Sequence, residues 1–264
     1  MTKGIFITGT DTGIGKTYVT ALLLAELRRR GARAAAFKPI SCGAGGRHDA
    51  EIYADLMNGD QPLDLLNPIY LRYPLAPSVA AKLERRRIDF GKIFRCYSLL
   101  TAHYSPVLVE GAGGLLVPIK RLSQNYVAAG FSLRLPRTRK ECGYKNAGFE
   151  IGSEHNYFVG DLALDLGLPV LIVARLGLGT INHTLLTVRQ AQAMKLRVAG
   201  IVLNDMVGGK RGFTPNSYSG IAEQTNIKEM PRLCGVPLLG VVPHGKRGAA
   251  KAAREICRKL GLLR

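Results

Sequence analysis

The chain has 264 residues, of which 47% are hydrophobic, and its 37 basic against 19 acidic side chains give a formal charge of +18. This hydrophobic content is enough to bury a core and argues against a disordered protein. The five cysteines are odd in number and scattered, with no Cys-x-x-Cys pair, which disfavours both a disulfide framework and a thiolate zinc site.

The first residues lead directly into the apolar run Gly4–Thr8 with no signal-peptide pattern, and no segment approaches the ~20 apolar residues of a membrane span. We therefore expect a cytoplasmic protein without a membrane segment. Basic clusters at Arg28–Arg30 and Arg85–Arg87 end two predicted helices, where cations complement the helix dipole. Without tryptophan, zinc-finger spacing or aromatic-interleaved basic strands, we expect no specific nucleic-acid partner.

Short apolar runs rich in β-branched residues alternate with longer helix-like stretches along the chain. The runs are Gly4–Thr8, Arg33–Lys38, Pro106–Glu110, Pro169–Ala174, Val198–Asn204 and Pro237–Val242. This alternation predicts an α/β fold, a mostly parallel sheet with helices on both faces, whose ligands gather at the carboxyl ends of the strands. No linker or long repeat divides the sequence, so we predict a single domain over residues 1–264.

The first run is followed by "GTDTGIGKT", Gly9–Thr17, and then by a helix-like stretch. Its glycines let backbone N–H groups approach phosphate, Lys16 would neutralise the β and γ phosphates, and the Thr17 hydroxyl would hold Mg²⁺. Five residues separate Gly9 from Gly15 where the usual pattern has four, so an ordinary glycine-rich turn is the alternative. The flanking strand and helix favour a P-loop NTPase-like fold that binds ATP.

Lys38 follows the second run in "KPISCG", where Pro39 would stiffen the exit and Gly43 would permit a tight turn. A surface lysine is commonly just solvated. At the carboxyl end of a strand beside the phosphate loop, a second cation can instead stabilise a phosphoryl group in transfer. We therefore assign catalytic roles to Lys38 and Lys16.

Two carboxylates complete the predicted phosphate site. Asp49 lies in "HDA", and Glu110 ends a strand that reads as buried, where an unpaired charge is costly. Together with Thr17 they predict a Mg²⁺ site. Taken alone, Asp49 is equally compatible with a helix cap.

The segment from 120 to 160 departs from this pattern, because it is polar, basic and dotted with glycines and has no sustained apolar period. We interpret it as an atypical insertion outside the core, running from "VPI" to a helix near Asp161. This insertion either has no role or forms a basic lid. Because it contains no known binding pattern, the absence of a role is favoured.

The motifs "GTDTGIGKT", "KPISCG", "HDA", "VEGAGG", "GLGTINHTLLT" and "LND" occur in the order typical of the ATP-dependent dethiobiotin synthetases. The chain resembles that P-loop synthetase family from residue 3 to about 245, except in the insertion. The resemblance implies that ATP and Mg²⁺ are used to close the ureido ring of dethiobiotin from 7,8-diaminononanoate and CO₂. One amine captures CO₂ as a carbamate, the carbamate takes the γ-phosphoryl group, and the second amine displaces phosphate from the mixed anhydride.

The resemblance also implies the binding residues. Those for the nucleotide and its metal are Gly13, Ile14, Gly15, Lys16, Thr17, Tyr18, Asp49, Glu110, Gly111, Ala112, Gly113, Asn204, Asp205, Val242, Pro243 and His244. Asn204 would recognise adenine, although without the resemblance it is equally a plain turn asparagine. Those for the substrate are Thr12, Ser41, Cys42, Thr180, Ile181 and Asn182. The last three would bind the substrate carboxylate at a helix N-terminus supplied by the other subunit, so a homodimer is implied.

Three alternatives of function remain at this point. The phosphate loop is shared with other ATP-dependent amidases and ligases, and the basic charge would suit a DNA-associated partitioning-type ATPase. Such ATPases usually carry a further lysine at the start of the loop, and Lys3 lies too far upstream. The insertion would also be compatible with a nucleotide-binding fold that has lost activity.

Cys42 stands where the family has a small hydroxyl residue, so either Cys42 or Ser41 would contact the carbamate. Cys42 itself is either a reactive thiol or a packing residue.

Overall fold

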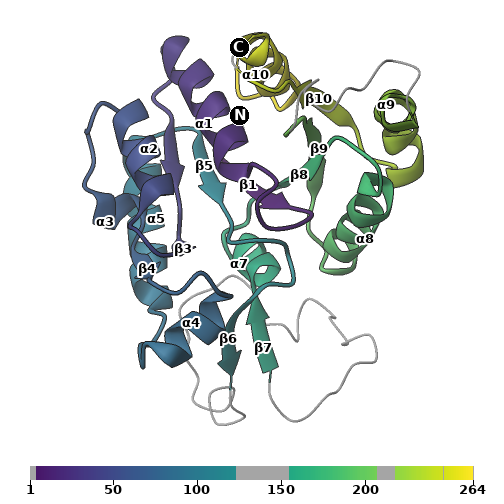
Figure 1. Ribbon diagram of the computed structural model, residues 1–264. Helices are drawn as coiled ribbons and strands as arrows, with labels where there is room; N and C mark the ends of the chain where they lie inside the picture. Colours follow the sequence, from purple (N-terminus) through teal and green to yellow (C-terminus); the bar gives the residue numbers. More distant parts are fainter. Residues whose placement is uncertain (1–3, 123–154, 207–217, 246, 264) are drawn as a thin grey trace.

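The computed structural model describes residues 4–122, 155–206, 218–245 and 247–263. Its centre is a six-stranded sheet in the order β10-β9-β8-β1-β5-β2, in which neighbouring strands are parallel (Figure 1). The strands are β1 (Gly4–Gly9), β2 (Ala35–Phe37), β5 (Val107–Glu110), β8 (Val170–Arg175), β9 (Val198–Asn204) and β10 (Leu238–Val242). They coincide with the six apolar runs of the sequence, so the predicted parallel sheet is confirmed.

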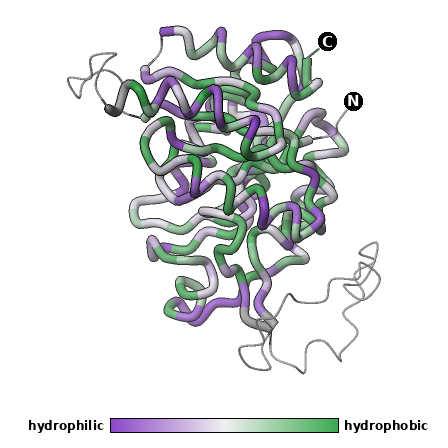
Figure 2. Tube along the Cα trace, turned by 90° about the vertical axis from the view of Figure 1, so that its right-hand side faces the viewer, coloured by the Kyte–Doolittle hydropathy of each residue, from purple (hydrophilic) through white to green (hydrophobic). Residues whose placement is uncertain are grey.

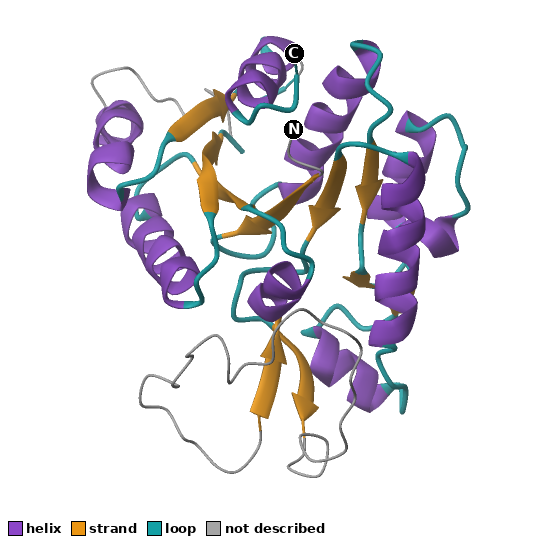
Figure 3. Cartoon of the chain, turned by 180° about the vertical axis from the view of Figure 1, so that it is seen from behind, coloured by secondary structure: helices purple, strands orange, loops and turns teal. Residues whose placement is uncertain are grey.

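Helices follow most of these strands and cover both faces of the sheet (Figure 3). They are α1 (Lys16–Arg29), α2 (His48–Leu56), α3 (Leu63–Leu66), α4 (Pro77–Leu83), α5 (Phe90–His103), α7 (Val159–Asp165), α8 (Thr180–Ala193), α9 (Tyr218–Cys234) and α10 (Ala249–Lys259). The most hydrophobic stretches run through the middle of the molecule (Figure 2). Within the described ranges, no helix is long and apolar enough to cross a membrane.

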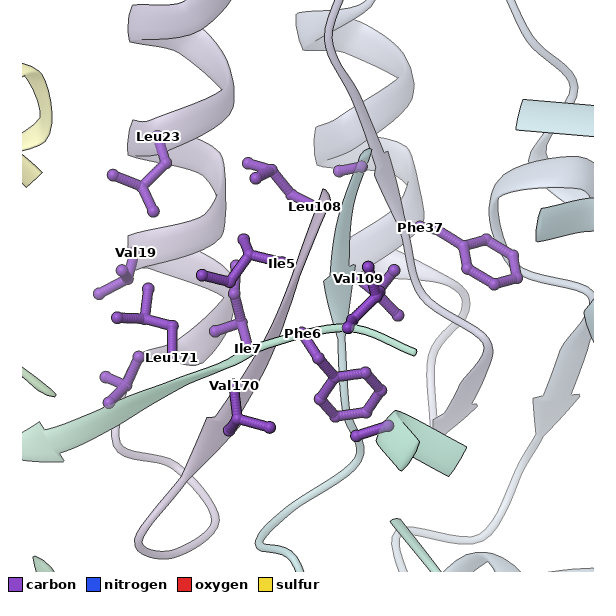
Figure 4. Packing of buried hydrophobic residues seen from close by; sticks show 14 of the residues in the cluster. Ile5, Phe6, Ile7, Val19, Leu23, Phe37, Leu108, Val109, Val170 and Leu171 are labelled. Atoms are coloured by element: carbon purple, nitrogen blue, oxygen red, sulfur yellow. The ribbon is translucent and has the colours of Figure 1, made fainter. Parts of the chain in front are cut away.

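β1 shows how the sheet is buried on both faces. All six of its residues are buried, and successive side chains point to opposite sides, as strand geometry requires. Ile5 and Ile7 point toward Val19 and Leu23 of α1, whereas Phe6 points to the other face (Figure 4). Because neither face meets water, the strand reads as a continuous apolar run rather than as an alternating one.

Two small ladders were not predicted from the sequence. β3 (Ile40–Cys42) pairs in parallel with β4 (Ile69–Leu71), so the chain stays extended from Ile40 to Cys42. The Gly43 N–H donates to the Leu71 carbonyl at 3.0 Å, and the predicted turn follows directly, at Ala44 and Gly45. β6 (Pro118–Leu122) pairs antiparallel with β7 (His155–Phe158) at the lower end of the view in Figure 1.

Most of β6 and all of β7 lie inside the insertion predicted at 120–160, so the two ends of that segment belong to the fold, contrary to the prediction. Most of the insertion, 123–154, lies outside the described residues, so its role stays a prediction. Leu122 pairs with His155, so the two residues that border this stretch are neighbours in the ladder. The helix expected near Asp161 begins two residues earlier, at Val159.

A buried carboxylate joins α1 to α10 on one face of the sheet. Glu26 accepts hydrogen bonds from Arg29, at 2.9 Å to each of its oxygens, and from Arg30 at 3.1 Å. Arg254 of α10 adds a contact at 3.4 Å to Oε1. These bonds, led by that from Arg29, lower the pKa of Glu26 below its usual value of 4.5. Part of the predicted basic cluster is therefore paired within the fold.

We expect Glu26→Gln to lower the free energy of unfolding by about 1 kcal/mol at pH 7, because the arginines are half-exposed and solvent screens them. A carboxylate whose pKa is lowered by folding stabilises the protein above its unfolded pKa, and this stability is lost as pH falls through the folded pKa. In urea titrations, the difference from the unsubstituted protein should thus begin to shrink below pH 4.5 and disappear once the pH has fallen below the folded pKa. Glu255→Gln, in an exposed pair with Lys259, is the control and should cost about 0.3 kcal/mol. A difference that does not vary with pH would contradict this role.

Candidate active site

The phosphate loop connects β1 to α1 at the carboxyl edge of the sheet. Lys16 is the first residue of α1, and its side chain is only 6% exposed. Its ammonium donates to the Asp11 carbonyl at 3.0 Å, and burial lowers its pKa to about 8. The loop thus places a cation and the N–H groups of a helix N-terminus at one point, which is the arrangement that binds phosphate.

Gly15 is required by its surroundings as well as by its backbone. It precedes α1 with φ 85°, in the left-handed region that favours glycine. A Cβ there would lie 2.2 Å from Nδ2 of Asn204, the last residue of β9. The same Nδ2 donates to the Ile14 carbonyl at 2.9 Å, while Asn204 Oδ1 is buried without a partner among the described residues. Asn204 therefore holds the loop and leaves an acceptor available.

Four predicted residues from four parts of the chain meet at this edge. Thr17 Oγ1 lies 3.0 Å from Glu110 Oε1 and 3.1 Å from Asp49 Oδ1. The Lys38 ammonium lies 2.6 Å from Glu110 Oε1 and 2.6 Å from Asp49 Oδ2. The side chains predicted to form one site do come together, because the strands that carry or precede them are parallel and end at the same edge.

The ion pairs in this cluster outweigh burial in setting its charge states. Burial alone would lower the pKa of Lys38, which is 5% exposed, but the carboxylates of Glu110 and Asp49 raise it above its usual value. Burial likewise opposes ionisation of Asp49, yet Lys38 keeps the pKa of this carboxyl below its usual value. Lys38 is therefore held as a cation.

The structure adds a residue that the sequence analysis missed. Tyr53 of α2 is fully buried, and its hydroxyl donates a hydrogen bond to Glu110 Oε2. The only sequence signal was its position four residues after Asp49, which places both side chains on one helix face. A tyrosine at helical spacing is ordinarily a core residue, so this signal does not identify its partner.

The chemistry of these oxygens fits Mg²⁺. A hydroxyl lies within 3.1 Å of two carboxylates, and Mg²⁺ prefers oxygen ligands. No group of three or more His, Cys, Asp or Glu side chains suited to a metal occurs in the described part of the chain. The remaining coordination would fall to phosphate oxygens and water, as is usual for Mg²⁺.

One alternative from the sequence is wrong and another is disfavoured. Asp49 is not a helix cap, because α2 begins at His48 and Arg47 holds the cap position. Burial raises the pKa of the Cys42 thiol to about 11, which disfavours a reactive thiolate there. Ser41 donates to Asn67 Oδ1 at 2.7 Å, so its hydroxyl already has a partner.

The other predicted residues lie at the same edge of the sheet. The Gly111 N–H donates to the Ile7 carbonyl, and the Asp205 N–H donates to the Val242 carbonyl, both at 2.9 Å. The Tyr18 hydroxyl donates to the carbonyl of Gly245, which follows His244. Residues that are exposed here are Thr12, Gly13, Tyr18 and His244, and those that are half-exposed are Ala112, Gly113, Asp205 and Pro243.

Thr180, Ile181 and Asn182 form the first turn of α8. Thr180 is buried with its hydroxyl unpartnered within the described ranges, and Asn182 is exposed. The loop before this turn is fixed by Asn226 of α9, whose amide donates to the Gly177 carbonyl at 2.8 Å.

Two hollows lie away from these residues. One of about 800 Å³ is lined by Arg28, Arg33 and Tyr104 among others, and one of about 620 Å³ by Gly4, Tyr97 and Pro169 among others. Gly4 begins β1 and Pro169 precedes β8, so the second hollow is at the amino ends of the strands. Ligands of parallel α/β sheets bind at the carboxyl ends, so we do not assign the active site to it.

A parallel sheet with a glycine loop, a Lys-Thr pair at a helix N-terminus and two facing carboxylates defines a P-loop nucleotide-binding protein. A family profile described as an AAA domain matches residues 3–131 and 147–250, passing over part of the insertion. The septum site-determining protein MinD complexed with Mg-ADP from Pyrococcus horikoshii has the same fold, with a TM-score of 0.51 at 15% identity over 98% of this chain and 96% of that one.

Relatives at higher identity define the family more closely. An ATP-dependent dethiobiotin synthetase from Thermodesulfovibrio yellowstonii is 36% identical over 92% of this chain and 90% of its own length. One from Anaeromyxobacter sp. is 39% identical over 89% of this chain and 91% of its own length. The chain belongs to the ATP-dependent dethiobiotin synthetase family, as its motifs predicted. The amidase and partitioning-ATPase alternatives are not favoured.

We expect Gly15→Ala to reduce ATP affinity at least ~10-fold, because the added methyl group strains the backbone and displaces the Asn204 amide from the loop. Gly31→Ala is the matched control: its φ of 79° is also left-handed, but nothing lies within 4 Å of a Cβ there. Both substitutions should lower the free energy of unfolding by about 1–2 kcal/mol. Calorimetric titration with ATP should separate them, and unchanged affinity in Gly15→Ala would contradict the packing argument.

Proposed function

We propose that this chain closes the ureido ring of dethiobiotin from 7,8-diaminononanoate and CO₂, using ATP. The observation that carries the proposal is the pair of buried lysines, Lys16 and Lys38, at the phosphate loop of a chain in the dethiobiotin synthetase family. An anionic carbamate must approach an anionic triphosphate in this reaction, and fixed cations offset their repulsion.

The reaction has three steps. One amine of the substrate adds to CO₂ and loses a proton, giving a carbamate. A carbamate oxygen attacks the γ-phosphorus and ADP leaves, giving a carbamic-phosphoric anhydride. The second amine then attacks the anhydride carbonyl, loses a proton and expels phosphate, which closes the ring. No protein nucleophile is needed, so the residues act by positioning and by stabilising charge.

Lys16 would hold the β and γ phosphates together with the N–H groups at the start of α1. Lys38, which is held as a cation, would face the phosphoryl group as it moves to the carbamate. Thr17, Asp49 and Glu110 would hold Mg²⁺, which when bound neutralises charge on the triphosphate.

Adenine would lie against the end of β9. Asn204 Oδ1 is a buried acceptor without a partner in the described part of the chain, and the amino group of adenine is a donor that would satisfy it. The backbone of Val242–His244, next to Asp205, would line the same pocket.

The substrate carboxylate would bind the N–H groups of Thr180–Asn182 at the start of α8. We propose that this helix serves the active site of a second copy in a homodimer. Support comes from the exposed apolar side chains around it: Leu178 is 81% exposed, Leu186 61% and Ile221 48%. Apolar groups gathered at a surface are typical of an interface. The cytoplasmic location stays a prediction.

The test is to incubate the purified protein with diaminononanoate, bicarbonate, Mg²⁺ and ATP and to measure dethiobiotin by mass. We expect one ADP and one phosphate for each dethiobiotin formed. Phosphate release without dethiobiotin would contradict the proposal. Sedimentation of the same preparation tests the dimer, and an active monomer would contradict the shared site.

We expect Lys38→Met to lower kcat on the order of 10²-fold or more, because a cation beside the moving phosphoryl group acts mainly in the transition state. ATP affinity should change less than about threefold, since Lys38 contacts the carboxylates and not the phosphate loop itself. Lys251→Met, at an exposed position of α10, is the control. An increase confined to the KM for ATP would make Lys38 a binding residue instead.

A further inference from the structure

We propose that Tyr53 is a positioning residue for Glu110, fixing the orientation of this carboxylate so that one of its oxygens is presented to the metal. The inference rests on the proposed function, because it concerns the site assigned above to Mg²⁺. Tyr53 is fully buried in α2, and Glu110, at the end of β5, is 1% exposed. A buried carboxylate must have its oxygens hydrogen-bonded, and the two oxygens of Glu110 have different partners.

The two oxygens of the Glu110 carboxylate contact different residues. Oε1 faces the phosphate loop, where it lies 3.0 Å from Thr17 Oγ1 and 2.6 Å from the Lys38 ammonium. Oε2 accepts from the Tyr53 hydroxyl. The two oxygens are chemically equivalent, so the tyrosine contact fixes the plane of the carboxylate: a partial rotation about its terminal bond would break this contact. Tyr53 therefore leaves Glu110 with a single oxygen directed to the metal site and sets its direction.

α2 also couples the two metal-binding carboxylates to each other. Asp49 and Tyr53 lie four residues apart on this helix and so on the same face. Asp49 approaches Thr17 directly, and Tyr53 reaches Glu110 from one turn further along. A single rigid helix thus fixes the position of one carboxylate and the orientation of the other. Mg²⁺ tolerates little deviation from octahedral geometry, so this coupling matters for a small cation.

The test is Tyr53→Phe, which keeps the ring in the core and removes only the hydroxyl. Binding of Mn²⁺ to the protein saturated with ADP is measured by electron paramagnetic resonance. We expect the Kd for Mn²⁺ to rise about 10-fold, as is typical when a partner that orients a ligand is lost. Affinity for ADP without metal should stay within about twofold. Tyr97→Phe is the matched control, because Tyr97 lies in α5 and its ring packs against Phe37, away from the metal site.

A double-mutant cycle separates positioning from a general loss of structure. If Tyr53 acts through Glu110, then adding Tyr53→Phe to Glu110→Gln should not change the Kd for Mn²⁺ further. Additive effects, or equal losses in Tyr53→Phe and Tyr97→Phe, would overturn the proposal. So would a lower affinity for metal-free ADP that matches the loss for Mn²⁺.

The outcomes also separate this inference from the proposed function. Mn²⁺ binding with ADP does not depend on which substrate the enzyme uses. A protein that forms no dethiobiotin, yet loses Mn²⁺ affinity in Tyr53→Phe, would refute the proposed reaction and support the positioning role. A protein that forms dethiobiotin, yet binds Mn²⁺ equally well with and without the Tyr53 hydroxyl, would refute the positioning role alone.

Discussion

The carboxylate of Glu110 is the constraint on which the active site depends. It ends a central strand and is almost completely buried, so it requires compensating partners. Lys38 follows the neighbouring strand, Thr17 lies in the first turn of α1 and Tyr53 lies in α2, and each contacts it. One buried charge thereby links the phosphate loop, a second strand and a helix. The arrangement of the site follows from satisfying that charge.

Much of this arrangement could be predicted because a parallel sheet leaves clear signals in its sequence. Strands covered on both faces read as continuous apolar runs, and all six were found in this way. Residues just beyond such strands meet at one edge, so the meeting of Lys38, Glu110 and the phosphate loop could be expected from the sequence alone. The roles of Asn204 and of the first turn of α8 came only from the family resemblance.

The missed features depend on contacts that local patterns do not encode. Pro39 and Gly43 indicated a turn, which forms at Ala44 and Gly45, but the pairing of residues 40–42 with Ile69–Leu71 depends on a distant segment and left no local signal. Tyr53 looked like a core residue, and only the position of Glu110 gives its hydroxyl a function. A reactive Cys42 was compatible with the lysines expected nearby, yet its burial raises the pKa of the thiol to about 11.

The charges in the site explain how two lysines so close together can have different tasks. Asp49 and Glu110 carry two negative charges and Lys38, which is paired with both, carries one positive charge, so Lys38 compensates only part of their charge, and the remainder would favour a divalent cation. Lys16 is not paired with these carboxylates in the same way. Its ammonium donates a hydrogen bond to the Asp11 carbonyl, and burial lowers the pKa of Lys16 to about 8. A phosphate would be a better partner for Lys16 than that carbonyl. In the proposed function, Lys38 would therefore stay paired with the carboxylates, and Lys16 would be the cation that receives the phosphates.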